Sequence, residues 1–250
     1  MSLHIVPPER YPAVLALIDP EGCGAVYAYS VAEGAQSGIL YTDENETVLL
    51  VRHACGFALL FGAYTEEILR ETGEMILHPA PYARTVLFAP DERAAGYFRK
   101  QDDFIAEQRL FYRYPSGEIP PENPAVRRMT TAMLAQIAGR ITPAFSWDNP
   151  DDFAEKGAGY CVMQDGIPAA WAFSAAVSSR ETDIGVETDE KYRRRGLAFA
   201  AATAMVRDTL LRRKMPVWAC HTENTGSRKL AEALGFSVCG QCTTVRRRSQ

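Results

Sequence analysis

The chain of 250 residues lacks any apolar run that approaches the roughly 20 residues of a membrane-spanning helix. Its first residues include a histidine, two prolines and two charged side chains, and so they lack the apolar core of a signal peptide. The formal net charge of −4 gives no overall excess of positive charge that would attract nucleic acid or an anionic membrane. We therefore expect a cytoplasmic protein whose partners include neither nucleic acid nor a membrane.

Cysteine is scarce and scattered, which argues against a disulfide framework in a chain of this size. The six cysteines lie mostly in apolar segments, at positions 23, 55, 161, 220, 239 and 242. Cys239 and Cys242 have the spacing of half a zinc site, and Cys220-His221 is a candidate for the other half. Adjacent residues of a strand point to opposite faces, so Cys220 and His221 would not both reach one ion. We expect no metal and reduced cysteines that serve as small buried hydrophobes.

Proline marks one boundary in the chain. Residues 114–124 contain four prolines, so this stretch cannot hold a continuous helix or a central strand. The prediction is an N-terminal α/β domain over residues 1–114, a linker over residues 115–124 and a second domain over residues 125–250.

The first half is patterned as a mixed α/β unit without a chemical motif. Its sequence predicts an opening helix at 8–18, later helices at 65–74 and 92–101, and strands at 25–31, 38–41, 47–53, 56–61, 84–88 and 106–113. His53 and His78 have no sequence-local partner that would orient a catalyst, so we interpret them as structural or surface residues. This half either covers the substrate side of the second half, or is a dimerisation or stabilising domain. Its element order suggests a degenerate copy of the second half.

The second half is organised around a strand, a basic glycine turn and a helix. Residues 182–188 alternate as in a strand, and residues 197–213 carry apolar side chains at helical spacing without Gly or Pro. The turn between them contains three arginines, followed by Gly196. Free N–H groups at a helix N-terminus, together with the helix dipole and the arginine charges, suit a phosphate group. Gly196 permits close approach of the ligand to the backbone.

These residues resemble a known family. Arg193-Arg194-Arg195-Gly196-Leu197-Ala198 is similar to the Arg/Gln-x-x-Gly-x-Gly/Ala signature of the GNAT superfamily, whose members transfer an acyl group from acyl-coenzyme A. After a predicted strand at 216–220, residues 224–236 resemble the Asn-x-x-Ala/Ser-x-x-Leu-Tyr-x-x-x-Gly-Phe helix of that family. Two signatures in the right order are much harder to obtain by chance than one.

The predicted element order after the linker also matches the family. It consists of a strand at 126–129, helices at 131–141 and 148–155, strands at 160–163, 169–178 and 182–188, and then helix, strand, helix and strand. The resemblance covers residues 125–245. It implies a mixed α/β (α+β) fold, in which a GNAT-like, mostly antiparallel, splayed sheet flanked by helices follows the smaller α/β domain.

The resemblance also implies a coenzyme site. The backbone of Val186 and Thr188 would pair with the pantetheine arm, because a strand edge that splays from its neighbour offers unpaired N–H and C=O groups. Asn224 and Ser227 match positions that touch the coenzyme arm, although Asn224 also suits a helix N-cap. The pyrophosphate would be held by Arg193, Arg194, Arg195, Gly196, Leu197 and Ala198.

Acyl transfer to an amine needs a base, because the attacking amine must be neutral. The candidates are Glu181, Asp183 and Glu187, which alternate onto one face of the central strand; the alternative is that each is a solvated strand end. Ala231 replaces the tyrosine with which the family often protonates the leaving thiolate. Cys220 is an alternative acyl-accepting nucleophile, but a buried thiol in an apolar strand stays protonated.

The function predicted from these residues is acetyl transfer from acetyl-CoA to a primary amine of a small molecule, by direct attack in a ternary complex and without a metal. The finer resemblance is to the zwittermicin-resistance acetyltransferases, which implies an aminopolyol or a similar small amine as acceptor. The alternative is a degenerate GNAT-like module that binds coenzyme A or a protein without turnover. A homodimer is a further expectation.

Overall fold

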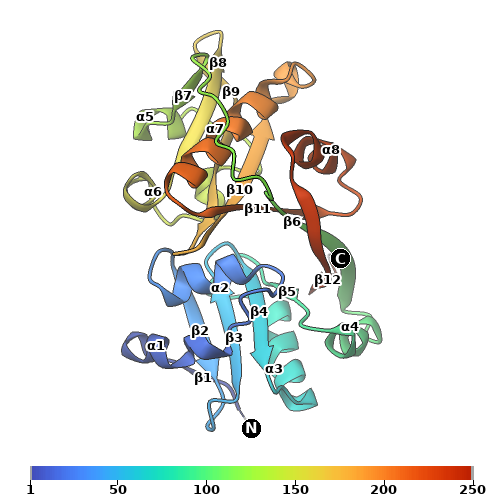
Figure 1. The fold of residues 1–250 in the computed structure, drawn as a ribbon. Coiled ribbons are helices and arrows are strands. Elements are labelled where there is room, and N and C mark those ends of the chain that lie inside the picture. Colours follow the sequence, from blue (N-terminus) through green and yellow to red (C-terminus); the bar gives the residue numbers. More distant parts are fainter. Residues whose placement is uncertain (1, 249–250) are drawn as a thin grey trace. The chain divides into compact units, whose positions relative to one another are not determined.

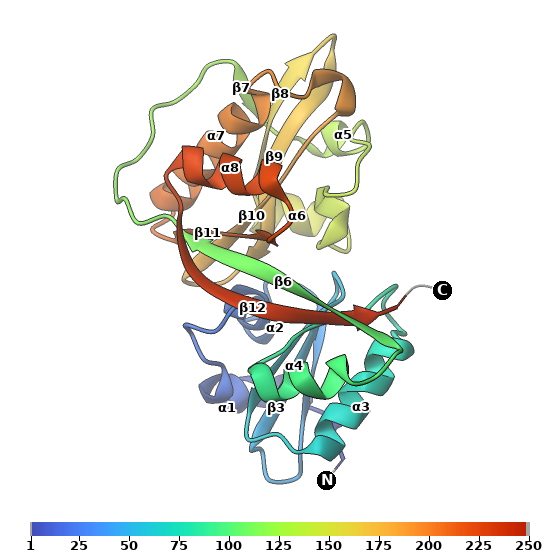
Figure 2. The ribbon, with the colours of Figure 1, turned by 90° about the vertical axis from the view of Figure 1, so that its right-hand side faces the viewer.

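The computed structural model describes residues 2–248 and divides into two compact units. Unit one contains the residues up to Leu110 and those from Gly240 onward, and unit two runs from Phe111 to Cys239. The chain leaves unit one within strand β6 (Phe104–Arg113) and returns within β12 (Ser237–Arg247). Figure 2 shows these two long strands side by side.

The units divide the chain differently from the boundary predicted at 115–124. That segment is irregular, as its prolines require, but it lies inside unit two. Composition marks where regular structure stops, whereas the unit boundary depends on strand pairing between distant segments. The return of the chain to unit one at Gly240 has no local sequence signal.

Unit one has an antiparallel meander at its centre (Figure 1). Its sheet runs in the order β1-β2-β3-β4-β5-β12-β6. The strands that lie wholly in this unit are β1 (His4–Ile5), β2 (Gly38–Thr42), β3 (Val48–His53), β4 (Phe57–Gly62) and β5 (Val86–Phe88). The helices are the short η1 (Pro8–Arg10), α1 (Tyr11–Val14) and η2 (Leu15–Leu17), followed by α2 (Ala25–Ala32), α3 (Glu66–Leu77) and α4 (Glu92–Arg99).

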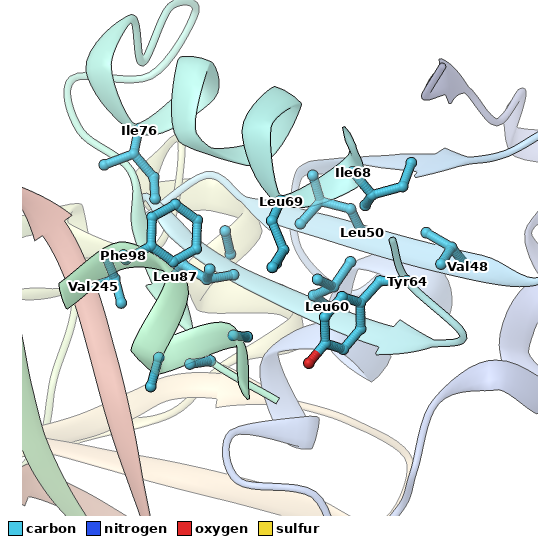
Figure 3. Close-up of a cluster of buried hydrophobic side chains, with 14 of the residues drawn as sticks. Val48, Leu50, Leu60, Tyr64, Ile68, Leu69, Ile76, Leu87, Phe98 and Val245 are labelled. Atoms are coloured by element: carbon cyan, nitrogen blue, oxygen red, sulfur yellow. The ribbon is translucent and has the colours of Figure 1, made fainter. Parts of the chain in front are cut away.

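Helix α3 covers one side of this sheet through a single apolar stripe. Ile68, Leu69 and Ile76 recur at helical spacing and pack on strand residues such as Leu50 and Leu87, all fully buried (Figure 3). At the start of the helix, the Thr65 hydroxyl accepts a hydrogen bond from the Ile68 N–H, and two glutamates occupy the first turn. The N-terminus of α3 is therefore already capped and negatively charged.

The strand predicted over residues 25–31 is wrong, because the structure places helix α2 there. Gly24, with φ of 79°, reverses the chain just before the helix. The helix is buried on nearly all sides, so it shows no polar stripe with helical period, while its valine and tyrosine residues favour a strand interpretation. The helix predicted over 131–141 is also too long, since α5 (Thr131–Leu134) ends after one turn.

Unit two contains the sheet order β6-β11-β10-β9-β8-β7 (Figure 1). Its remaining strands are β7 (Val126–Arg128), β8 (Gly159–Gln164), β9 (Ile167–Val177), β10 (Glu181–Thr188) and β11 (Met215–His221). Besides α5, its helices are η3 (Pro143–Phe145), α6 (Pro150–Lys156), η4 (Glu190–Tyr192), α7 (Leu197–Leu211) and α8 (Thr225–Leu234). Over residues 2–248, no helix combines the length and apolarity needed to cross a bilayer.

The two faces of the unit-two sheet are covered differently. Helix α7 packs on β8, β9 and β10 from one side. On the other side, Trp171 and Phe173 of β9 join a core with Phe153 of α6 and Trp147, so α5, η3 and α6 lie over that face. Strand β10 therefore lies with α7, the helix that follows the basic turn, on one side of it, and with the loops and short helices on the other.

Both units follow the same element order, which is a strand, short helices, three antiparallel strands, a helix, a parallel strand, a helix and a strand. In both, the parallel pairing is confined to the start of the third antiparallel strand, with Phe57↔Val86 to Leu59↔Phe88 in unit one and Glu181↔Met215 to Asp183↔Val217 in unit two. The repeat supports the view of unit one as a diverged copy. The units differ at the turn before the helix. In unit two a basic glycine turn precedes α7, whereas in unit one α3 begins with two glutamates.

His53 of unit one makes folding sensitive to acid. Burial lowers the pKa of this imidazole from 6.5 to about 3, and its Nδ1 accepts a hydrogen bond from the Cys55 N–H. Between these values the unfolded chain binds a proton that the folded chain cannot, so stability falls as the pH drops from about 6.5 toward 3.

We expect the free energy of unfolding to fall by about 2 kcal/mol between pH 7 and pH 5 through this residue alone. Urea titrations at both pH values would measure the loss. The matched variant His53→Gln should have a smaller loss by about that amount. Equal losses in both proteins would contradict the assignment.

Candidate functional site

Strand β10 opens away from β11 in unit two. The two strands pair in parallel only from Glu181 to Asp183, whereas β10 pairs with β9 along its whole length to Thr188. From Ile184 to Thr188, the described pairing is with β9 alone. The edge that faces β11 is therefore suited to pair with an extended ligand, although the Thr188 carbonyl also accepts a hydrogen bond from Arg193 Nε at 3.4 Å. Pairing of Val186 and Thr188 with a ligand stays a prediction.

The basic turn follows directly at the open end of β10. Its position is fixed by two hydrogen bonds, from the Asp189 N–H to the Ala169 carbonyl at 2.9 Å and from the Tyr192 hydroxyl to Asp165 Oδ2 at 2.8 Å. Gly196, with φ of 75°, turns the chain into α7. A Cβ at this residue would meet no heavy atom within 4 Å, so the space over the turn is open.

The first turn of α7 begins at this open space. The first bond of the helix runs from the Ala200 N–H to the Gly196 carbonyl, so the N–H groups of residues 197–199 have no intrahelical acceptor. They lie at the positive end of the helix dipole. A contribution of the Leu197 and Ala198 backbone to phosphate binding stays a prediction.

The three arginines of the turn differ in their surroundings. Arg193 contacts Glu190 at 3.2 Å, and Arg195 lies over the Tyr192 ring at 5.4 Å. Arg194 is exposed and has a φ of 62°, in the left-handed region that favours glycine. This conformation strains the backbone of an arginine, while the exposed side chain leaves its charge open to solvent.

Replacing Arg194 by glycine should therefore separate backbone strain from charge. We expect Arg194→Gly to raise the free energy of unfolding by about 0.5–1 kcal/mol, because glycine adopts this conformation without strain. The same change should weaken binding of an anionic ligand several-fold, because a cation is lost. Urea denaturation and calorimetry on the same preparation would measure both effects. A less stable variant would contradict the strain argument.

Helix α8 uses its two predicted ligand residues in structural contacts. Asn224 is its N-cap and accepts a hydrogen bond from the Ser227 N–H at 3.1 Å. The Ser227 hydroxyl accepts one from Trp218 Nε1 at 2.9 Å, which ties α8 to β11. The predicted contact of both residues with the coenzyme stays a prediction, and their positioning roles are visible in the structure.

Glu187 lies against the loop that follows α5. Its Oε2 accepts a hydrogen bond from the Ile141 N–H at 2.6 Å, and Trp171 Nε1 donates to the Ile141 carbonyl at 2.8 Å. A Cβ at Gly139 would come within 2.5 Å of the same carboxylate. The sequence gives no sign of this clamp beyond a glycine inside the overlong predicted helix.

The three carboxylates share a face but do not form one cluster. The register shift between β9 and β10 skips Ala175 of β9, so β10 keeps its two-residue alternation and Glu181, Asp183 and Glu187 stay on the loop-covered face. Residues 181 and 187 are separated by roughly 20 Å along the strand.

Each of the other two carboxylates has its own environment. Glu181 pairs with Arg113 at 3.1 Å, a contact that the sequence did not reveal. Asp183 is buried and belongs to the last residue pair between β10 and β11, where the strands begin to diverge. Asp183 is therefore the candidate nearest to the point at which the strands open.

Family comparison agrees with this geometry. Residues 121–244 match the family model described as GNAT acetyltransferase. This part of the chain belongs to the GNAT acetyltransferase family. Enzymes of this family use acetyl-CoA as co-substrate, which fits the open turn before α7.

Relatives of known sequence or structure extend over nearly the whole chain. An uncharacterised N-acetyltransferase of Bacillus subtilis, YdfB, is 28% identical and covers 94% of this chain and 95% of its own. A GCN5-related N-acetyltransferase-like protein from Streptococcus suis has the same fold, with a TM-score of 0.74, 18% identity and coverage of 96% and 99%. A tandem GNAT protein from the clavulanic acid biosynthesis pathway aligns over 100% of both chains, with a TM-score of 0.55 and 10% identity.

The GNAT domain departs from its family at the position of the usual tyrosine. Ala231 is fully buried. Tyr112 lies on β6, the strand next to β11. Burial is the main cause that raises the pKa of Tyr112. The Tyr112 hydroxyl lies beside Arg228 without a well-aligned hydrogen-bond partner among the described residues. Tyr112 is itself buried. Cys220 is buried in β11, as predicted.

Proposed function

We propose that this protein transfers the acetyl group of acetyl-CoA to a primary amine of a small molecule, by direct attack in a ternary complex. The observation that carries the proposal is the opening of β10 from β11 immediately before a basic turn with free helix amides. When bound, the coenzyme supplies an activated thioester.

The residues around the opening divide the work of binding. The edge of β10 at Val186 and Thr188 is suited to the amide groups of a pantetheine arm, because an extended strand and an extended amide-bearing chain can pair through hydrogen bonds. The α7 amides with Arg193, Arg194 and Arg195 are suited to the pyrophosphate, and Gly196 leaves room for it. Asn224 and Ser227 hold α8 in place beside this path.

The acceptor is assigned to the face that carries the carboxylates. We assign Asp183 as the base that takes the proton of the attacking amine, because it lies where the two strands begin to diverge. Glu187 positions the loop at Ile141, and Glu181 pairs with Arg113. A face with three acids favours a cationic amine before it loses its proton, and an aminopolyol of the zwittermicin type fits that chemistry.

A second candidate is a coenzyme-binding module without turnover, and the buried Ala231 favours it. Release of coenzyme A thiol from acetyl-CoA, measured against a panel of polyamines, aminopolyols and aminoglycosides, separates the two. Acceptor-dependent thiol release supports the enzyme. Calorimetric binding of acetyl-CoA with no release for any amine supports the module, and no binding at millimolar ligand overturns both.

Several expectations from the sequence remain proposals. These are a cytoplasmic location, a homodimer, and a role of residues 1–114 in choosing the acceptor. A fragment of residues 115–250 is a poor test of that role, because it loses Phe111–Arg113 of β6, which belong to unit two, and carries residues 240–250, which belong to unit one. Point substitutions on unit one within the full chain, with acceptor specificity as the readout, are the better test.

A further inference from the structure

The Cys-x-x-Cys motif at Cys239 and Cys242 does not act as a pair. Both cysteines lie on β12, three residues apart, so their side chains point to opposite faces of the strand. Cys239 is exposed and Cys242 is partly buried. No cluster of three His, Cys, Asp or Glu residues in the described part of the chain is arranged for a metal ion. Another partner for Cys242 comes from a distant part of the sequence.

That partner is Cys23, which lies in the turn before α2 in unit one. Its sulfur is 3.2 Å from the position that a Cβ would occupy at Gly240. Gly240 and Cys242 are on the same face of β12, so the missing side chain at Gly240 leaves room for the Cys23 sulfur beside Cys242. The two thiols share a hydrogen bond, and both are partly exposed.

The shared hydrogen bond makes the two thiols unequal. The bond from Cys242 lowers the pKa of Cys23, against the opposing effects of burial and of Asp19. The same bond and burial raise the pKa of Cys242, against a smaller opposing effect of Arg109. Cys23 is therefore the better thiolate of the pair, and Cys242 keeps its proton until Cys23 has reacted.

We propose that Cys23 and Cys242 are a redox-active dithiol that closes to an intramolecular disulfide by exchange with a low-molecular-weight disulfide such as oxidised glutathione. The Cys23 thiolate attacks the glutathione disulfide, forms a mixed disulfide and releases one glutathione thiolate. The Cys242 thiol then loses its proton and displaces the second glutathione. Two protein thiols are oxidised, one disulfide reagent is reduced, and two glutathione thiols are produced.

A disulfide between Cys23 and Cys242 would join two residues that are separated by most of the sequence. Such a link restricts the unfolded chain strongly, because the loop it closes is long. We therefore expect the oxidised protein to show a higher thermal unfolding midpoint than the reduced protein. This inference concerns unit one and does not depend on the acetyl-transfer proposal.

The test uses the full-length reduced protein, incubated with oxidised glutathione and then alkylated. Intact mass should show two fewer alkylated thiols without added glutathione, and peptide mapping should find the Cys23 and Cys242 peptides joined. Treatment of the oxidised protein with a reductant should restore both thiols. A protein that keeps all its alkylated thiols, or that joins Cys239 to Cys242, would overturn the proposal.

Matched serine variants test the order of the steps. Cys242→Ser should accumulate a mixed disulfide at Cys23. Cys23→Ser should acquire glutathione at Cys242 at least tenfold more slowly, because Cys242 is partly buried and this burial, which remains in the variant, raises the pKa of its thiol. Cys239→Ser is the control and should close the disulfide as the wild type does. Equal glutathionylation of the two single variants would refute the assigned roles, and failure of the Cys239→Ser control to close would refute the pairing.

Discussion

Gly196→Asp is expected to weaken binding of acetyl-CoA by about 100-fold or more, because it places a carboxylate among the α7 amides that we assign to the pyrophosphate. Gly196 adopts a left-handed conformation with open space where a side chain would extend. The added charge would therefore face the ligand directly. Isothermal titration calorimetry on the folded variant measures the loss.

The control for this change is Gly196→Asn, which has nearly the same shape without the charge. Asparagine tolerates the left-handed region as well as aspartate does, so backbone strain is matched between the two variants. We expect the asparagine variant to bind within several-fold of the wild type. Similar losses for both variants would mean that shape or strain, and not charge, explains the effect.

The second large effect is expected at Asp183. Asp183→Asn should lower kcat by about 100- to 1,000-fold with little change in the KM for acetyl-CoA, because the amide cannot accept the proton of the attacking amine. The variant keeps the size and the hydrogen-bonding ability of the side chain. Steady-state thiol release with the acceptor found in the amine panel gives both constants.

Glu187 supplies the matched comparison. Glu187→Gln retains an oxygen that can accept the Ile141 N–H bond, so kcat should stay within a few-fold of the wild type. Glu187→Ala removes the clamp, and the KM for the acceptor should rise about tenfold as the loop loosens. A severe loss of kcat in Glu187→Gln with a normal Asp183→Asn would reverse the two assigned roles.

Local sequence signals predicted the strand, the basic turn and the helix to which we assign the coenzyme. The basic turn, its glycine and the helix that follows are contiguous, so their arrangement follows from strand, turn and helix propensities alone. The N-cap at Asn224 was predictable for the same reason, because a capping bond spans only a few residues. The strained φ of Arg194 was not visible, since arginine carries no signal for a left-handed conformation.

The acceptor side depended on contacts that sequence separates widely. The bonds of Ile141 with Glu187 and Trp171 join three segments, and the ion pair of Glu181 with Arg113 joins β10 to β6. No periodicity predicts such contacts, because each depends on which strands become neighbours. The segment of helix α2 was predicted as a strand for a related reason. The helix is buried on nearly all sides, so its sequence lacks the polar stripe that identifies a surface helix.

We expect unit two, and not unit one, to bind acetyl-CoA, along β10 and at the start of α7. Hydrogen–deuterium exchange of the full-length protein with and without acetyl-CoA tests this expectation most directly, because each backbone segment is measured separately. Exchange should slow at residues 184–188 and 193–200 and stay unchanged at residues 62–69, the equivalent turn of unit one. Protection at 62–69 with none at 193–200 would mean that acetyl-CoA binds unit one instead.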